Sequence, residues 1–370
     1  MSWWITQRIS LSLARKLAAL LLIILTTPCA GLDATSYLGS GKSAVAAAPH
    51  PLSWAYQPAN LYWSSTSFAQ YSTAHFNGTG KDYYHFSRTS RGLSQQEKNA
   101  QIESLYGREL FLQLGVGAWV MPFRNFATGV NVDTNVAAHV QGRSLPEVAG
   151  NVWARASAPA MFAGSAFGGQ AVWGLQLIPD FVLSQRLRED LIEIYEDPSL
   201  VQPRIAMEQN LFFRGKAGMV IPKRFYQHEF RFAATIDDFL IAGPNPGKVF
   251  DSVSSVGQQP YEMSQVLGLS YGQAVWLKLP LTIYVHAAHH LQRTSKMPND
   301  YHNRIGLRCS INHGRVMVDS SMFGEYKSMS VALKVLGLRV AYAVYREPLD
   351  LGAGVRVSRK NYVLQLAAMF

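Results

Sequence analysis

Alternation of apolar and polar side chains fills the sequence from about residue 204 to the end. It is clearest in four stretches, which cover residues 229–236, 303–311, 338–344 and 351–358. A period of two is typical of a β-strand whose two faces meet different surroundings. Turn signals at Met297–Asp300 and Glu347–Asp350 separate such stretches, so the pattern predicts a meander of neighbouring antiparallel strands.

The first half of the chain is less regular. A tight-turn signal at Phe76–Gly80 separates two aromatic-rich segments, Leu61–His75 and Lys81–Thr89, which we expect to be strands. The spacing of apolar residues predicts helices at Ser94–Tyr106 and Ser184–Tyr195.

The last ten residues, Asn361–Phe370, form an amphipathic strand with a terminal aromatic residue. Alternation alone would also suit a soluble β-sandwich, but an ending of this kind resembles the last strand of bacterial outer-membrane β-barrels, which the barrel assembly machinery recognises. Tyr362 and Phe370 lie about one membrane crossing apart, as aromatic girdles require. The lipid-facing residues expected to carry this assembly signal are Tyr362, Leu364, Leu366 and Phe370. The fold class that we predict is all-β, a transmembrane antiparallel β-barrel.

Residues 1–31 have the three parts of a secretory signal peptide: basic residues, the apolar run Leu17–Leu25, and small residues at its end. Nine apolar residues are too few to span a bilayer, which takes about twenty. We therefore expect cleavage within residues 30–34. Lipid attachment at Cys29 is an alternative, which Pro28 disfavours.

The mature chain would carry 31 basic and 24 acidic side chains, a net charge of +7, because three of the 34 Lys and Arg residues lie in the leader. Blocks of like charge are missing from the sequence, which argues against a nucleic-acid partner. Cys309 would be the single cysteine after cleavage, so no intramolecular disulfide is expected.

The stretch Gly39–Ser43 contains the Gly-Lys-Ser end of a phosphate-binding loop. The full signature needs a glycine at position 36, which is Ser36, and a preceding buried strand. The sequence therefore predicts no nucleotide binding.

Other enzymatic signatures are also missing. The sequence has no Gly-x-Ser-x-Gly elbow and no cysteine pair for a metal. His286 and His290 fall on one strand face and His289 on the other, too few convergent ligands for a metal site. We expect no enzymatic activity, no cofactor and no metal.

The segment "GSGKSAVAAAPHPLSWAYQPANLYW", residues 39–63, resembles the start of the FadL-type long-chain fatty acid transporters and their PorV-like relatives, with a spirochaete branch as the nearest likeness. Those proteins have an Asn-Pro-Ala-Gly-Leu motif before their first strand. Here the counterpart is Gln57–Leu61, with Gln57 for asparagine and Asn60 for glycine.

The resemblance implies about fourteen strands in residues 61–370, with residues 32–60 folded inside the barrel as a hatch. Small residues in such a hatch would let its backbone lie close to the barrel wall. The expected hatch residues are Gly39, Gly41, Tyr56, Gln57, Pro58, Ala59, Asn60 and Leu61.

The resemblance also implies a location in the bacterial outer membrane and passive uptake of small hydrophobic molecules such as long-chain fatty acids. Its expected partners are membrane lipid, the assembly machinery and the cargo. The alternative is a barrel that does not transport and acts as a PorV-like docking shuttle or a surface-interaction protein.

Five arginines fall on the less apolar face of their strands and are expected to point inward: Arg231, Arg304, Arg308, Arg339 and Arg356. The lipid face excludes them, since a charge at mid-membrane costs about 2–4 kcal/mol. They could orient an anionic head group, or they could form ion pairs with inward acids such as Glu229 and Asp319 that hold the hatch.

Overall fold

The computed structural model describes residues 44–46, 52–77, 94, 96–97, 100, 103–104, 109–141, 147–190, 208–243, 264–276, 280–292, 303–350 and 356–370. Its strands are β1 (Phe68–Asn77), β2 (Glu109–Phe123), β3 (Phe126–Gln141), β4 (Glu147–Ser157), β5 (Ala160–Ala166), β6 (Ala171–Asp190), β7 (Glu208–Phe225), β8 (His228–Ala242), β9 (Ser264–Trp276), β10 (Pro280–Gln292), β11 (Asn303–Ile311), β12 (Val316–Phe323), β13 (Tyr326–Val335), β14 (Leu338–Asp350) and β15 (Arg356–Met369). Four short 3₁₀ helices are η1 (Ala44–Ala46), η2 (Ser53–Ala55), η3 (Pro58–Trp63) and η4 (Phe167–Gly169).

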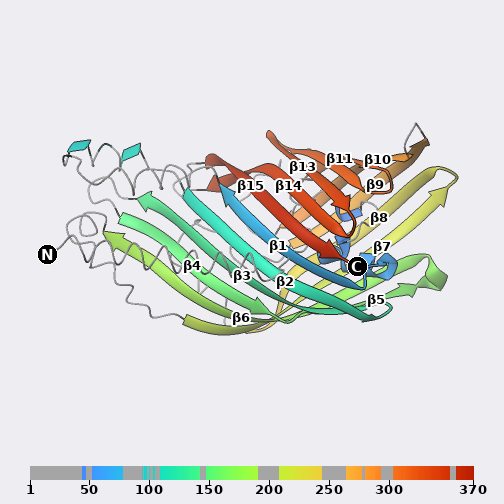
Figure 1. The fold of residues 1–370 in the computed structure, drawn as a ribbon, viewed down its shortest axis with the longest axis horizontal. Coiled ribbons are helices and arrows are strands. Elements are labelled where there is room, and N and C mark those ends of the chain that lie inside the picture. The colour runs from blue at the N-terminus through green and yellow to red at the C-terminus, as the bar shows by residue number, and fades with distance from the viewer. Residues whose placement is uncertain are drawn as a thin grey trace.

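The strands form one antiparallel sheet that closes on itself (Figure 1). Strands adjacent in sequence pair with one another, and closure comes from β1 pairing with β15, from Ala69 opposite Met369 to Asn77 opposite Asn361. Both β4 and β5 lie between β3 and β6, so they are two halves of one interrupted strand. The barrel therefore has fourteen strands, which confirms the predicted fold class.

The interruption between β4 and β5 falls at Ala158 and Pro159. Pro159 has no backbone N–H to donate, yet its carbonyl accepts a hydrogen bond from the Gly129 amide at 3.0 Å. The Ala158 amide donates to the Pro179 carbonyl at 3.1 Å. Backbone hydrogen bonds thus continue across the interruption.

The two faces of the barrel wall differ in polarity. In β11 the side chains of Ile305 and Leu307 point outward and are 62% and 42% exposed, whereas Arg304 and Arg308 point inward and are buried. The same alternation runs through β8, β14 and β15. Since successive strand residues point to opposite faces, the period of two in the sequence gives an apolar outside and a more polar lumen.

Most of the described short turns lie at one end of the barrel, and long connections lie at the other, which also has the two-residue turn 324–325. Turns 124–125, 226–227 and 336–337 lie at the same end as Phe370 and the start of β1, while residues 78–108 and 191–207 connect strands at the opposite end. Outer-membrane barrels have short periplasmic turns and long extracellular loops. This pattern assigns the end with the C-terminus to the periplasmic side.

Three local expectations were wrong. Residues 184–190 belong to β6, where they pair with β4 from Ser184 opposite Trp153 to Asp190 opposite Glu147, because the ladder supplies partners that outweigh the helical spacing. Glu347–Asp350 is the end of β14 and not a turn. Residues 61–63 belong to η3, which Pro58 starts with its fixed φ.

The predicted helix at Ser94–Tyr106 agrees with the described residues there, of which 96–97, 100 and 103–104 are helical. The Glu97 carboxylate accepts hydrogen bonds from the Ser94 hydroxyl at 2.7 Å and the Ser94 amide at 2.8 Å, a capping box. The bond from the Ser94 hydroxyl is the main reason that the pKa of Glu97 lies below its usual value. No helix of the described residues is long and apolar enough to cross a membrane.

The end of β15 leads to a first prediction, on assembly. Phe370 points outward, is 68% exposed and stacks on Phe68, whereas Met369 is 4% exposed and packs inward beside Leu61. We expect Phe370→Asp to reduce the fraction of assembled barrel on heat-modifiability gels several-fold. Met369→Ala should assemble but lose roughly 2–5 kcal/mol of folding stability, the usual cost of truncating a buried methionine. Equal loss of assembly in both variants would contradict the assignment of Phe370 as the assembly signal.

Candidate functional site: a plugged barrel lumen

The N-terminal segment Leu52–Leu61 lies inside the barrel, and we call it the plug. In Figure 1 the short blue helices lie close to the C-terminus, at the periplasmic end. Leu52, Trp54 and Leu61 pack in one apolar cluster with Tyr71, Trp119, Met161 and Met369 of the wall. The apolar part of the lumen at this end is therefore filled by the chain itself.

Two glycines in the wall make room for the plug. Gly174 of β6 and Gly218 of β7 are opposite one another in the ladder. A Cβ atom on Gly174 would overlap the backbone of Pro58 and Ala59, and one on Gly218 would overlap the side-chain oxygen of Gln57. The close approach of the plug to the barrel wall therefore depends on two glycines of the wall.

Polar contacts fix the position of the plug. Gln57 Nε2 donates a hydrogen bond to Thr235 Oγ1 at 2.8 Å. Before the plug in the chain, the carbonyl oxygen of Ala46 in η1 accepts a hydrogen bond from Ser270 Oγ at 2.7 Å. On the C-terminal side of the plug, the Arg231 guanidinium lies 4.9 Å from the ring centroid of Trp63, within range of a cation–π contact.

The two departures from the resembled motif have a structural explanation. Asn60 does not adopt a positive φ, so the position needs no glycine. The backbone N–H of Asn60 donates a hydrogen bond to the backbone carbonyl of Gln57 at 2.9 Å. Gln57 has one methylene more than asparagine, and its longer side chain reaches Thr235 across the lumen.

The structure brings most of the predicted hatch residues together. Tyr56, Gln57, Ala59, Asn60 and Leu61 are all buried, and Pro58 lies with them in the lumen. Gly39 and Gly41 lie outside the described residues. The role of the whole set as a hatch stays a prediction.

Arg308, Arg231 and Arg339 have polar partners in the lumen. Arg308 Nε donates to Asp319 Oδ1 at 2.6 Å, and Arg231 Nε donates to Glu229 Oε1 at 2.7 Å. Arg339 Nη1 donates to Gln365 Oε1 at 2.7 Å. The first two are ion pairs with Asp319 and Glu229, and the third is a hydrogen bond to a neutral amide. A role of these pairs in holding the hatch stays a prediction.

The other two arginines are described less completely. Arg304 is buried in β11, opposite Ala288 of β10. Arg356 begins β15, and the structure does not describe its side chain. A role of the five arginines in orienting a ligand stays a prediction.

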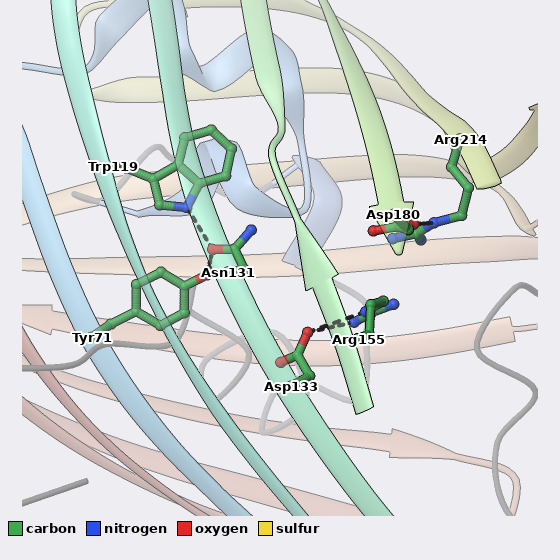
Figure 2. A network of polar contacts seen from close by, with 7 residues as sticks. All are labelled: Tyr71, Trp119, Asn131, Asp133, Arg155, Asp180 and Arg214. Atoms are coloured by element: carbon green, nitrogen blue, oxygen red, sulfur yellow. Dashed lines mark hydrogen bonds and ion pairs between the residues drawn. The ribbon is translucent and has the colours of Figure 1, made fainter. Parts of the chain in front are cut away.

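Further ion pairs lie on strands β3, β4, β6, β7 and β8, and sequence analysis missed them. Arg155 pairs with Asp133 at 2.8 Å, and Arg214 pairs with Asp180 where both side chains are almost fully buried (Figure 2). Lys216 pairs with Asp237 at a bulge of the β7–β8 ladder. These pairs could be predicted from opposite charges at inward positions of neighbouring strands, but only if the register between those strands is known.

A hydrogen-bond junction connects the plug region to the first three strands. Asn131 Oδ1 accepts from Tyr71 OH at 2.6 Å and from Trp119 Nε1 at 3.1 Å (Figure 2). The Trp119 ring also meets the edge of Trp54, with 4.9 Å between ring centroids. The orientation of one plug side chain is therefore linked to polar groups of the wall.

An apolar lumen patch lies farther toward the extracellular end. It consists of two separate clusters, Trp153 with Val182 and Phe212, and Phe111 with Ala137, from strands β2, β3, β4, β6 and β7. All five are buried in the lumen. The lumen thus contains apolar as well as charged surface.

The remaining candidate residues are placed as follows. Leu364, Leu366 and Phe370 are exposed on the outer face of the barrel, and Tyr362 lies on the same face. His286 and His290 are buried in the lumen while His289 faces outward. Among the described residues no group of three or more His, Cys, Asp or Glu side chains could hold a metal ion.

A closed antiparallel barrel with an apolar outer surface and a polar lumen is the architecture of bacterial outer-membrane β-barrel proteins. The chain belongs to this structural class, with a plug formed by its own N-terminal segment.

No family model matches the chain, and no curated protein matches it. Among solved structures, it is similar to the toluene transporter TbuX of Ralstonia pickettii, at 9% identity and a TM-score of 0.46, covering 91% of this chain and 98% of that one. A FadL homologue of Pseudomonas aeruginosa matches at 11% identity and a TM-score of 0.43, covering 93% and 98%. CdiB from Acinetobacter baumannii matches at 8% identity and a TM-score of 0.37, covering 81% of this chain, which spans 60% of CdiB.

A second prediction follows from the wall glycines. Gly174→Ala forces a methyl group into the plug backbone, so the plug should shift while the barrel still assembles, because overpacking costs about 1–3 kcal/mol. Single-channel conductance in planar bilayers should rise. Gly115→Ala is the matched control, because an added Cβ there meets only the ends of the Asp133 and Thr73 side chains. Unchanged conductance in Gly174→Ala would contradict the close packing of plug and wall.

The buried pair of Arg308 and Asp319 gives a third prediction. Asp319→Asn leaves an uncompensated buried guanidinium and should reduce the free energy of unfolding by about 3–5 kcal/mol. The double variant Arg308→Met/Asp319→Leu should recover most of this loss, since it removes both charges. Urea unfolding in lipid vesicles measures both, and a double variant as unstable as Asp319→Asn would show that the charges are not coupled.

Proposed function

We propose that the protein mediates passive uptake of small hydrophobic molecules across the outer membrane, with the plug as a movable hatch. Cargo would enter the lumen from the extracellular end and contact the apolar lumen patch. Movement of the plug would then open the periplasmic end. Burial of apolar surface would supply most of the binding free energy, at roughly 25 cal/mol per Å².

The observation that carries this proposal is incomplete hydrogen bonding of the plug. Within the part of the chain that the structure describes, four buried polar atoms of the plug have no hydrogen-bond partner: Trp54 Nε1, Gln57 Oε1, Asn60 Nδ2 and Asn60 Oδ1. A buried polar group left unpaired costs about 1–3 kcal/mol, and most buried groups in proteins are paired. Such an interface opposes plug movement less strongly than a fully bonded one.

Long-chain fatty acids are one candidate cargo. Their carboxylate would need a cation in the lumen, and Arg231, Arg308 and Arg339 already bind Glu229, Asp319 and Gln365. An anionic cargo would therefore have to compete with partners of the protein itself. The second candidate function is a barrel that docks other proteins and transports nothing.

The experiment locks the plug to the wall. In a Cys309→Ser background, Gln57→Cys and Thr235→Cys place thiols where the native side chains are hydrogen-bonded, and a short reducible bifunctional reagent can join them. Uptake of radiolabelled oleate and naphthalene by a Gram-negative host that lacks its own fatty-acid transporter should fall severalfold on cross-linking. It should recover after reduction.

Each single-cysteine variant, treated in the same way, is the control for the reagent. Uptake that exceeds the empty-vector level but does not respond to cross-linking would refute the hatch. No uptake above the empty-vector level, with assembled barrel in the membrane, would favour the docking function.

A further inference from the structure

Two polar atoms in the lumen have no hydrogen-bond partner among the described residues and lie beside the apolar lumen patch. They are Asn135 Oδ1, on a side chain that is 1% exposed, and Trp153 Nε1, on a side chain that is 4% exposed. Asn135 of β3 and Trp153 of β4 are directly opposite in the ladder and both point inward. An acceptor and a donor thus lie side by side, and neither is used.

Apolar side chains make up part of the surroundings of these two atoms. Trp153 packs against Val182 and Phe212, and Phe111 packs against Ala137, two positions along β3 from Asn135. Sites for small molecules are mostly apolar and carry a few placed polar groups that fix orientation. The patch with its donor and acceptor has this composition.

Charge at this wall does not favour an anion. Arg155 lies with its guanidinium 5.4 Å from the Trp153 ring centroid, but it donates two hydrogen bonds to Asp133 Oδ2. Arg214 is held by Asp180, of which the second oxygen, Oδ1, has no partner. A carboxylate entering here would meet carboxylates that already neutralise both arginines.

We propose that Asn135 and Trp153 recognise a neutral cargo with an apolar body and one hydroxyl group. A hydroxyl can donate to Asn135 Oδ1 and accept from Trp153 Nε1. Residues opposite in an antiparallel pair have Cβ atoms about 4.5–5.5 Å apart, so one oxygen can reach both side chains. This inference rests on the proposed function, since it names the cargo class of the same lumen.

The test compares three probes of one shape: naphthalene, 2-naphthol and 2-naphthoate, which are apolar, hydroxylated and anionic. Their equilibrium binding is measured on the full-length protein in lipid nanodiscs at pH 7, with empty nanodiscs as background. Two hydrogen bonds should make 2-naphthol bind about ten-fold more tightly than naphthalene. 2-Naphthoate should bind most weakly.

Two variants assign the preference to these residues. Trp153→Phe keeps an aromatic ring and removes Nε1, and Asn135→Leu removes the acceptor at similar volume. Each should abolish most of the preference for 2-naphthol and leave naphthalene binding unchanged. Trp173→Phe is the matched control, because Trp173 is exposed on the outer face of the same wall.

Equal binding of 2-naphthol and naphthalene to the wild type, tightest binding of 2-naphthoate, or no binding above background would each overturn the inference. So would a preference that survives in Trp153→Phe. The proposed function is tested separately by the uptake experiment. Absence of uptake in cells, with the preference for 2-naphthol intact, would refute transport but not the binding site at Asn135 and Trp153. If uptake responds to the plug cross-link but the protein shows no preference for 2-naphthol, the binding site is refuted and the transport function is not.

Discussion

Closure of the hydrogen-bond ladder is the constraint on which the rest of this structure depends. Lipid offers no partner for a backbone N–H or C=O group, so a strand at an open edge would leave unpaired groups in the bilayer. The pairing of β1 with β15 removes that edge, and it joins the two ends of the barrel domain through nine register pairs. Even the interruption at Pro159 keeps backbone hydrogen bonds to both neighbouring strands.

Once the ladder is closed, every strand has one face toward lipid and one toward the lumen. The lipid face excludes charge, so the ionisable side chains of the spanning strands gather in the lumen, where they need partners. Arg308 with Asp319 and Arg214 with Asp180 meet this need through neighbouring or nearby strands. The ion pairs are thus a consequence of burial in a closed wall, and they use up charge that a ligand would otherwise meet.

The sequence predicted those features that depend on one strand at a time. The inward face of Arg231, Arg308 and Arg339 follows from alternation, because a shift by one residue would place each arginine in lipid. Features that depend on neighbouring strands were harder to predict. The helix expected at Ser184–Tyr195 has the right local spacing, but its first part pairs with β4, and that pairing depends on the register of distant strands. For the same reason, the sequence did not predict the ion pairs formed by Asp133, Asp180 and Asp237.

The close packing of the plug depends on wall residues that are distant in the sequence. The sequence suggested that small residues at positions 39–48 of the N-terminal segment allow close packing, yet Gly174 and Gly218 make the contact at Gln57–Ala59 possible from the wall side. No feature of the sequence around these two glycines indicates this, because each contact spans more than a hundred residues. A wall that fits the plug backbone this closely fixes where the plug sits, while its unpaired polar atoms limit how firmly it is held. In the proposed hatch, the close fit would hold the plug in one place, and the incomplete hydrogen bonding would lower the free-energy cost of moving it.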